Sequence, residues 1–164
     1  SPIGFAFDSI EGVLTWAQRS AEVTHNHEEG IRGAQATAAA VFYARQHREK
    51  GSIRETLESQ FGYNLRFRLD DIRPTYEFSE TSRQTVPQAI VAFLESSDYE
   101  DTIRNAISLG GDADTLACIA GGIAEAYYGV PLDVTDRVMN ILDEKLAVTV
   151  RQFRQRFSLD SARA

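Results

Sequence analysis

Apolar residues recur at intervals of three and four positions through most of this 164-residue chain. Such spacing places side chains on one face of an α-helix. The first run predicts a helix over residues 9–23, opened by the capping-box-like sequence Asp8-Ser9-Ile10-Glu11. A second, alanine-rich run predicts a long helix from Glu28 to about Arg48, against which a neighbouring helix can pack closely.

The middle of the chain combines short helices with one long irregular stretch. Ser52-Ile53-Arg54-Glu55 has the form of a capping box and predicts a helix over residues 52–61, ended by Gly62. Residues 63–84 show no convincing period, and because so long a connection is unusual they are a candidate functional loop. The next helix is expected to start at Thr85-Val86-Pro87, with the proline near its first position.

The last third of the chain predicts further helices. Asp98 is expected to cap a helix through Ile107, and a helix of small residues is expected over 116–128, before Gly129. Residues 133–157 predict one or two amphipathic helices with a basic end. Because no strand-like alternation is persuasive anywhere, the sequence predicts an all-α fold, a compact multi-helix bundle forming a single domain over residues 1–164.

Composition limits the partners that the chain can have. A formal net charge of -7 argues against nucleic acid as the main partner, because phosphate binding requires a basic surface. No apolar run approaches the length of a transmembrane helix, so no membrane partner is expected. The single cysteine, Cys118, excludes an intrachain disulfide and is expected to be a buried thiol in a cytoplasmic protein.

The sequence Gly110-Gly111-Asp112-Ala113-Asp114-Thr115 carries the most distinctive chemistry of the chain. Its two carboxylates and one hydroxyl are oxygen ligands that suit Mg²⁺ or Mn²⁺, and the glycines permit a sharp turn before the helix that follows. The alternative is simple helix capping, since Asp and Thr are common caps and the positive end of a helix disfavours a cation.

Other polar residues offer weaker candidates. His25 and His27 flank Asn26 in a loop, but no further Cys or His ligand accompanies them, so a zinc site is not expected. A loop histidine that hydrogen-bonds a ligand or orders the turn is the preferred interpretation. Asp70 and Asp71, in the irregular stretch, are expected to be turn or cap residues rather than ligands.

Four segments taken in order resemble the C-terminal half of the ADP-ribosylglycohydrolase family, over about residues 1–145. They are Thr24-His25-Asn26-His27, Glu29-Gly30-Ile31-Arg32-Gly33-Ala34-Gln35-Ala36, Val86-Pro87-Gln88-Ala89-Ile90 and the run from Asn105 to Thr115. The resemblance implies an all-α fold and a binuclear magnesium site that helps to cleave the glycosidic bond between ADP-ribose and a modified side chain or small molecule.

The same resemblance assigns roles to individual positions. Asp112, Asp114 and Thr115 match the family's C-terminal metal-binding motif. His25 falls in a segment that lines the ADP-ribose cleft, and Gly30 and Gly33 match glycines at the start of the following helix. These three are the expected substrate-binding residues, and no catalytic residue is assigned.

One departure from the family pattern is large. Members carry a second motif of the Thr-Asp-Asp-Thr kind near their N-terminus, with an upstream acidic residue, and neither occurs in this chain, which therefore looks truncated. A two-metal site acts on water and substrate only when both ligand clusters are present, so we expect Mg²⁺ or Mn²⁺ to bind weakly.

Two functions remain open from the sequence. The first is Mg-dependent hydrolysis of an ADP-ribosylated substrate, with the missing N-terminal half supplied by a complementing chain or by self-association. The second is a non-catalytic helical module that binds ADP-ribose, another nucleotide or a protein. An inactive remnant of the fold would instead expose an apolar surface where the absent half packs.

Overall fold

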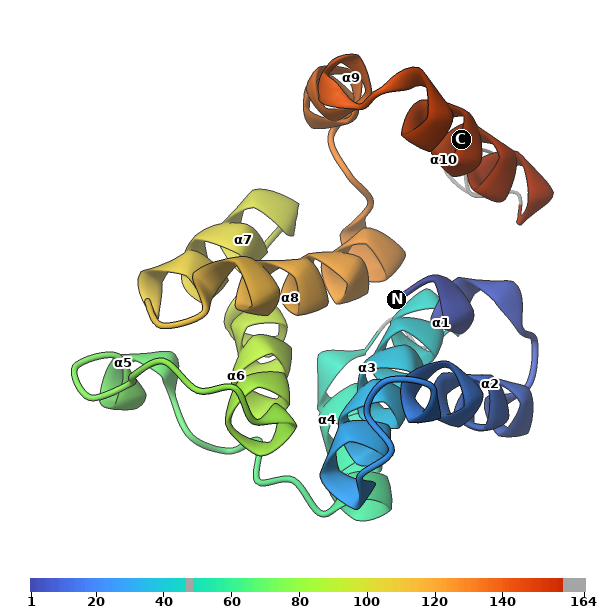
Figure 1. The fold of residues 1–164 in the computed structure, drawn as a ribbon. Helices are drawn as coiled ribbons and strands as arrows, with labels where there is room; N and C mark the ends of the chain where they lie inside the picture. The colour runs from blue at the N-terminus through green and yellow to red at the C-terminus, as the bar shows by residue number, and fades with distance from the viewer. Residues whose placement is uncertain (47–48, 158–164) are drawn as a thin grey trace. The chain divides into compact units, whose positions relative to one another are not determined.

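The computed structural model describes residues 1–46 and 49–157, and within these ranges its regular secondary structure is entirely α-helical. The helices, shown in Figure 1, are α1 (Pro2–Ala6), α2 (Ile10–Glu22), α3 (Glu28–Gln46), α4 (Lys50–Phe61), α5 (Leu69–Ile72), α6 (Ser82–Glu95), α7 (Tyr99–Ser108), α8 (Ala113–Tyr128), α9 (Leu132–Ile141) and α10 (Glu144–Arg156). The all-α prediction is confirmed. None of the helices in the described part of the chain is both long and apolar enough to cross a membrane.

The chain divides into two compact units. The first spans Ser1–Gly129 and contains α1 to α8, and the second begins at Val130 and contains α9 and α10. In the second unit, Asp143 caps α10 by accepting a hydrogen bond from the backbone N–H of Leu146 at 2.9 Å. The two amphipathic helices expected near the C-terminus are therefore present, and a polar cap separates them.

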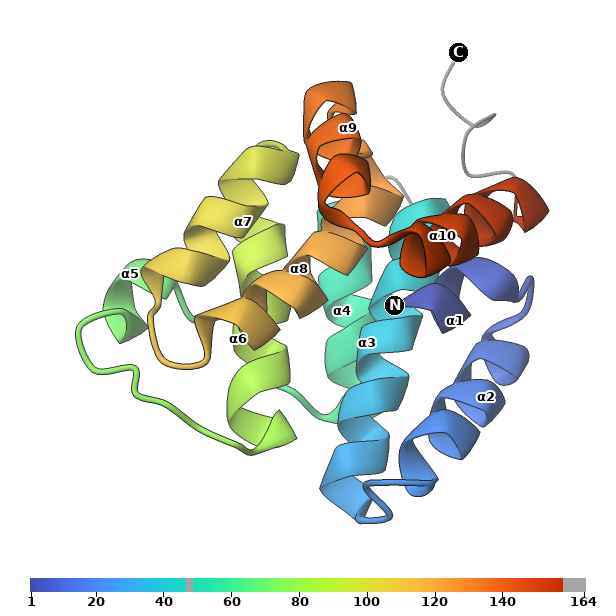
Figure 2. The same cartoon turned by 45° about the horizontal axis from the view of Figure 1, so that its top comes forward.

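Helix α3 forms the centre of the first unit, where it contacts α1, α2, α4, α6 and α8 (Figure 2). Every residue from Ala38 to Ala44 is buried, so the helix has no solvent face over this stretch. A helix buried on all sides lies in the core of a domain. Four of these seven residues are alanine, whose small side chain lets several helices approach the same axis.

Gly33 marks a close approach between α3 and α6. A Cβ atom placed on Gly33 would lie 2.7 Å from Cβ of Ser82 and 3.0 Å from its Oγ. Non-bonded carbon atoms attract best at about 3.5–4.0 Å, so a methyl group at position 33 would push the two helices apart. Ser82 is the first residue of α6, and the glycine therefore sets where that helix begins to pack on α3.

The structure corrects several expected helix starts. Helix α6 begins three residues before the expected start, so Pro87 lies inside it rather than near its first position. Ser9, not Asp8, caps α2 by accepting from the backbone N–H of Gly12 at 3.1 Å. Ser52 was expected to cap α4 but lies inside it. The first turn of a helix contributes little to the core, so hydrophobic spacing detects it poorly.

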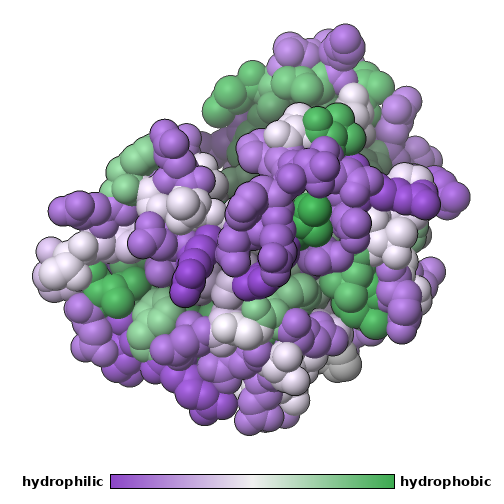
Figure 3. Space-filling model, turned by 60° about the horizontal axis from the view of Figure 1, so that its bottom comes forward, coloured by the Kyte–Doolittle hydropathy of each residue, from purple (hydrophilic) through white to green (hydrophobic). Residues whose placement is uncertain are grey.

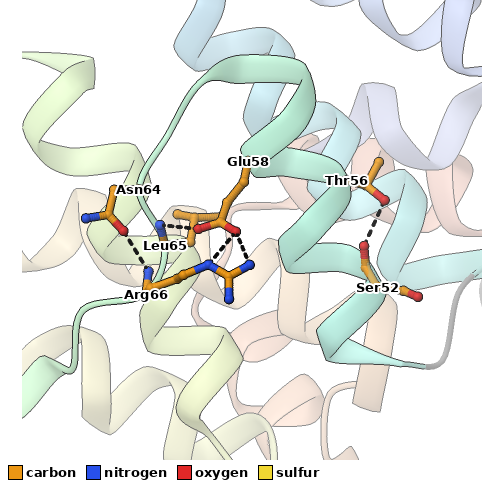
Figure 4. Close-up of polar contacts among 6 residues, drawn as sticks. All are labelled: Ser52, Thr56, Glu58, Asn64, Leu65 and Arg66. Atoms are coloured by element: carbon orange, nitrogen blue, oxygen red, sulfur yellow. Dashed lines mark hydrogen bonds and ion pairs between the residues drawn. The ribbon is translucent and has the colours of Figure 1, made fainter.

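Polar contacts fix the chain where it leaves α4 (Figure 4). Gly62 ends the helix in the left-handed region, with φ of 68°. One carboxylate oxygen of Glu58 then accepts from the backbone N–H of Leu65 at 3.1 Å, while the other accepts from Nε of Arg66 at 3.1 Å. These contacts fix the loop that carries the buried Tyr63.

Lys50 joins the start of α4 to the end of α6. Its ammonium group donates to the backbone oxygens of Phe93 at 2.8 Å, Leu94 at 3.3 Å and Ser96. Its Nζ also lies over the rings of Phe93 and Tyr128, 4.8 and 5.1 Å from their centroids. Burial nevertheless lowers the pKa of Lys50 to about 8, with Arg54 adding to the effect and Asp101 opposing it.

Polar side chains cover most of the face of the molecule in Figure 3, with apolar side chains in separate groups. The large apolar residues exposed on the first unit are Trp16, Val23, Phe78 and Ile107. Cys118 is also exposed, so the expectation of a buried thiol is wrong. The reason is its position two residues after the buried Leu116, which places it on the opposite side of α8.

Replacing Gly33 by alanine should destabilise the protein, because the new methyl group would separate α3 from α6. We expect a loss of about 1–3 kcal/mol in the free energy of unfolding, the usual cost of overpacking a core. Gly51→Ala is the matched control, since the nearest atom to its added Cβ is 3.7 Å away in an exposed helical turn. That substitution should stabilise by about 0.5–1 kcal/mol. Equal effects in urea denaturation would contradict the proposed close approach.

Lys50 should give the protein a measurable pH dependence of stability. Between the folded pKa of about 8 and the ordinary value of 10.5, the unfolded chain holds a proton that the folded chain has lost. Stability rises with pH wherever the unfolded state binds more protons. The free energy of unfolding of the wild type, measured relative to Lys50→Met, should therefore increase from pH 7.5 to pH 10. A difference that stays flat or decreases would refute the assignment.

Candidate functional site

The turn between α2 and α3 positions the two histidines differently. The backbone N–H of His25 donates to the oxygen of Ala21 at 2.7 Å, which folds the chain back at the end of α2. His27 immediately precedes α3: its backbone oxygen accepts from the backbone N–H of Ile31 at 3.0 Å, and its ring Nδ1 accepts from the backbone N–H of Glu29 at 3.2 Å. The ring of His27 is thus used as a helix cap.

His25 is exposed and lies at the wall of two adjoining hollows. The larger has a volume of about 890 Å³ and the smaller about 380 Å³. His25, Gly30 and Ser82 line both, and we call the two together the His25 hollow. Nδ1 of His25 lies 2.8 Å from the hydroxyl of Thr24, so this hydrogen bond orients the ring at the wall of the hollow.

Gly30 and Gly33, the two glycines expected at the site, allow neighbouring residues to pack closely around the hollow. A Cβ on Gly30 would lie 3.1 Å from the backbone oxygen of His25 and 3.2 Å from its Cβ, so glycine lets the loop pack on α3 more closely than a larger residue would. Gly33 lines the smaller hollow, where it permits the approach of Ser82 described above. The structure therefore brings His25, Gly30 and Gly33 together.

Part of the remaining wall of the smaller hollow comes from residues that the sequence did not single out. Ser20 from α2, Thr37 from α3, Ser82 from α6 and Ile119 from α8 all line it. Three of them carry hydroxyl groups that can bond to a polar ligand. They stand on four separate helices, so no spacing in the sequence connects them.

Two glycines shape the turn before α8. Gly110 and Gly111 have φ values of 75° and 59°, in the left-handed region that glycine adopts without a steric penalty. A Cβ on Gly111 would lie 3.0 Å from Cε1 of Tyr76 and 3.2 Å from the backbone oxygen of Glu77, so this turn packs on the irregular segment. The hydroxyl of Tyr76 donates to the backbone oxygen of Gln84 at 3.0 Å, which ties the turn to the start of α6.

The carboxylates of this turn are not used as helix caps in the usual way. Asp112 occupies the N-cap position of α8, but its side chain accepts no capping hydrogen bond. A side-chain hydrogen bond with Asp112 lowers the pKa of Asp114, and the backbone N–H groups of Asp114 and Thr115 lower it further. The two acidic side chains are therefore adjacent, and Asp114 is held in its ionised form at neutral pH.

Thr115 of the acidic turn and Ile119 of the His25 hollow lie on one face of α8. Thr115 and Ile119 are four residues apart, and such pairs lie one above the other on a helix, about 6 Å apart along its axis. Ile119 lines the hollow, whereas none of Asp112, Asp114 and Thr115 does. Across residues 1–46 and 49–157, no three His, Cys, Asp or Glu side chains gather in a way that could hold a metal ion.

The acidic residues of the irregular segment have a structural role. Asp70 forms an ion pair with Arg73, whose Nε donates to the hydroxyl of Ser108 at 3.1 Å. The hydrogen bond and charge of Arg73 lower the pKa of Asp70. Both Asp70 and Asp71 lie in the first turn of α5, as expected for turn or cap residues.

Comparisons with known proteins agree on one family. A family model described as ADP-ribosylglycohydrolase matches residues 1–162. ADP-ribosylhydrolase ARH3 of Homo sapiens is 32% identical over a 173-residue alignment that covers 78% of this chain and 48% of that protein. ADP-ribosylarginine hydrolase Tri1 of Pseudomonas putida is 33% identical over 118 residues, which cover 66% of this chain and 30% of that protein.

A similarity in structure supports the same relationship. A solved structure described as an ADP-ribosylglycohydrolase-related protein complex matches with a TM-score of 0.66 and 26% sequence identity, covering 96% of this chain and 55% of that one. The chain spans about half the length of the curated relatives it matches, such as ARH3 at 48%. The family model covers nearly the whole sequence, and the chain belongs to the ADP-ribosylglycohydrolase family.

Proposed function

We propose that the chain binds ADP-ribose in the His25 hollow and contributes the C-terminal half of a metal-dependent site that hydrolyses an ADP-ribose glycosidic bond. The observation that carries this proposal is the shared face of α8, on which Thr115 of the acidic turn lies one helical turn from Ile119 of the hollow. The second ligand cluster would come from a complementing N-terminal half, supplied by another chain or by self-association.

The acidic turn fits a hard divalent cation such as Mg²⁺ or Mn²⁺. Asp112, Asp114 and Thr115 would hold it, because carboxylate and hydroxyl oxygens are the ligands that such cations prefer. The carboxylate of Asp112 is not used as a helix cap, and the lowered pKa of Asp114 keeps that group ionised. When bound in a complete site, a metal of this kind lowers the pKa of water and stabilises negative charge on the substrate.

The residues of the hollow would bind and orient the ligand. His25 presents its imidazole ring as a polar contact, while Gly30 and Gly33 permit the close approach of His25 and Ser82 that shapes the wall around a ligand. The hydroxyl groups of Ser20, Thr37 and Ser82 can donate to or accept from sugar and phosphate oxygens.

A second function is favoured by the small number of ligands at the acidic turn. Among the described residues, no group of three or more His, Cys, Asp or Glu side chains is arranged so that it could hold a metal ion, and a two-metal centre needs at least that many ligands. The chain could then act as an ADP-ribose-binding or protein-interaction module without hydrolysis. Saturable binding without release of ADP-ribose, even after a complementing half is added, would identify this second function.

The first test is a titration of the chain with ADP-ribose by calorimetry. Replacing His25 by alanine should weaken binding about tenfold, the loss expected for one hydrogen bond to a ligand. Ser59→Ala is the control, since Ser59 is exposed on α4 and does not line the hollow, so the affinity should be unchanged. If the wild type shows no heat of binding, the proposed function fails for this chain alone.

The second test concerns the metal. The wild type should bind Mn²⁺, detected by electron paramagnetic resonance, and Asp114→Asn should weaken that binding at least tenfold because one charged ligand is lost. Asp136→Asn, on an exposed surface of α9, should leave it unchanged. With a complementing N-terminal half and an ADP-ribosylated substrate, Asp114→Asn should also abolish release of ADP-ribose. Equal Mn²⁺ affinity of the Asp114 and Asp136 variants would rule out the metal assignment.

A further inference from the structure

Residues 73–81, which connect α5 to α6, lie against the chain that enters the acidic turn (Figure 2), and we call them the bridging segment. Nε of Arg73 donates to the hydroxyl of Ser108, the last residue of α7, at 3.1 Å. Gly111 packs so closely on the segment that an added Cβ would lie 3.0 Å from Cε1 of Tyr76. The bridging segment therefore braces the chain from the end of α7 into the acidic turn.

The bridging segment is also hydrogen-bonded to the start of α6. The hydroxyl of Tyr76 donates to the backbone oxygen of Gln84 at 3.0 Å, and the hydroxyl of Ser79 donates to Oε1 of the same glutamine at 2.7 Å. The hydroxyl of Thr85 donates in turn to the backbone oxygen of Ser79 at 3.4 Å. Gln84 lines the larger part of the His25 hollow. One short segment thus contacts both the acidic turn and the wall of the hollow.

Tyr76 connects the two directly. Its ring packs on Gly111 and its hydroxyl bonds to Gln84, so a single side chain reaches from the turn to the wall of the hollow. A tyrosine side chain is rigid, with few rotatable bonds, and here it is held at both ends. A displacement of Gln84 would therefore move the ring relative to Gly111.

A ligand in the hollow reaches the acidic turn through the protein, because Asp112, Asp114 and Thr115 line neither part of the hollow. We propose that Tyr76 is a positioning residue, through which a ligand bound in the His25 hollow holds the acidic turn in place. This inference rests on the proposed function, since it takes ADP-ribose as the ligand. A turn that is already ordered loses less conformational entropy when it binds a cation.

Helix α8 offers a second route between the two parts of the site, since Ile119 lies one helical turn from Thr115. That route ends after the bend at Gly110 and Gly111, whose φ values are in the left-handed region. Glycine backbone has the greatest conformational freedom of any residue. The bend is therefore the part of the turn that most needs support from outside, and Tyr76 provides this support at Gly111.

The test is hydrogen–deuterium exchange of the chain with and without ADP-ribose, in the absence of metal. In the wild type, the ligand should slow exchange of the amides of residues 110–115 at least about fivefold, the lower end of the usual coupling between two sites. Tyr76→Phe keeps the ring but removes the hydroxyl that bonds to Gln84. In this variant ADP-ribose should still bind and still protect the first turn of α6, whereas the slowing at residues 110–115 should disappear.

Tyr128→Phe is the matched control. The hydroxyl of Tyr128 also donates to a backbone oxygen, that of Ser96 at 2.8 Å, but it does so at the other end of α6. Tyr128 lines neither part of the hollow. This variant should lose a similar hydrogen bond and yet keep the ligand-dependent slowing at residues 110–115.

Different failures of this experiment have different meanings. If the wild type does not bind ADP-ribose, the proposed function fails and the role of Tyr76 fails with it. If the wild type binds but exchange at residues 110–115 does not change, or if Tyr76→Phe keeps the slowing, the role of Tyr76 is refuted while the proposed function stands. Loss of the slowing in Tyr128→Phe as well would indicate a general loosening of the helices, and it would also overturn the inference.

Discussion

The candidate site depends on how closely α6 can approach α3. Gly33 leaves room for Ser82, and these two residues form part of the same hollow wall. Any larger side chain at position 33 would move the start of α6 outward and open the hollow. Since the turn before α8 is tied to Gln84 through Tyr76, the same movement would also displace the acidic turn. One steric contact therefore controls the shape of the hollow and the position of the acidic residues.

The sequence predicted the parts of the molecule that local patterns encode. Hydrophobic spacing located α3, the capping residue Asp98 located α7 and Gly62 located the end of α4, because each depends on neighbours within one or two helical turns. Starts of helices were less accurate, as α6 shows, and α1 was not predicted. That residues 1–164 act as a single domain stays a prediction, since α9 and α10 form a compact unit of their own.

Part of the site was also predictable, because some of its residues lie close together in the sequence. His25, Gly30 and Gly33 lie within nine residues, so one short segment places all three at the hollow. Ser82 and Ile119 join them only through packing between helices, and the contact of Lys50 with the end of α6 spans 43 residues of sequence. The role of His27 as a helix cap was likewise open from sequence, because a cap and a ligand contact both place a histidine at such a turn.

The acidic turn, unlike the hollow, needs further ligands before it can bind a cation strongly. A side-chain hydrogen bond with Asp112 and the backbone N–H groups of Asp114 and Thr115 lower the pKa of Asp114, so the turn carries negative charge at neutral pH. A divalent cation would be attracted to that charge, yet the positive end of α8 acts against it at the same place. Binding would therefore become strong only when further carboxylates arrive from outside the turn. Under the proposed function, a ligand would therefore bind to the hollow of this chain alone, whereas metal-dependent hydrolysis would require a complementing half.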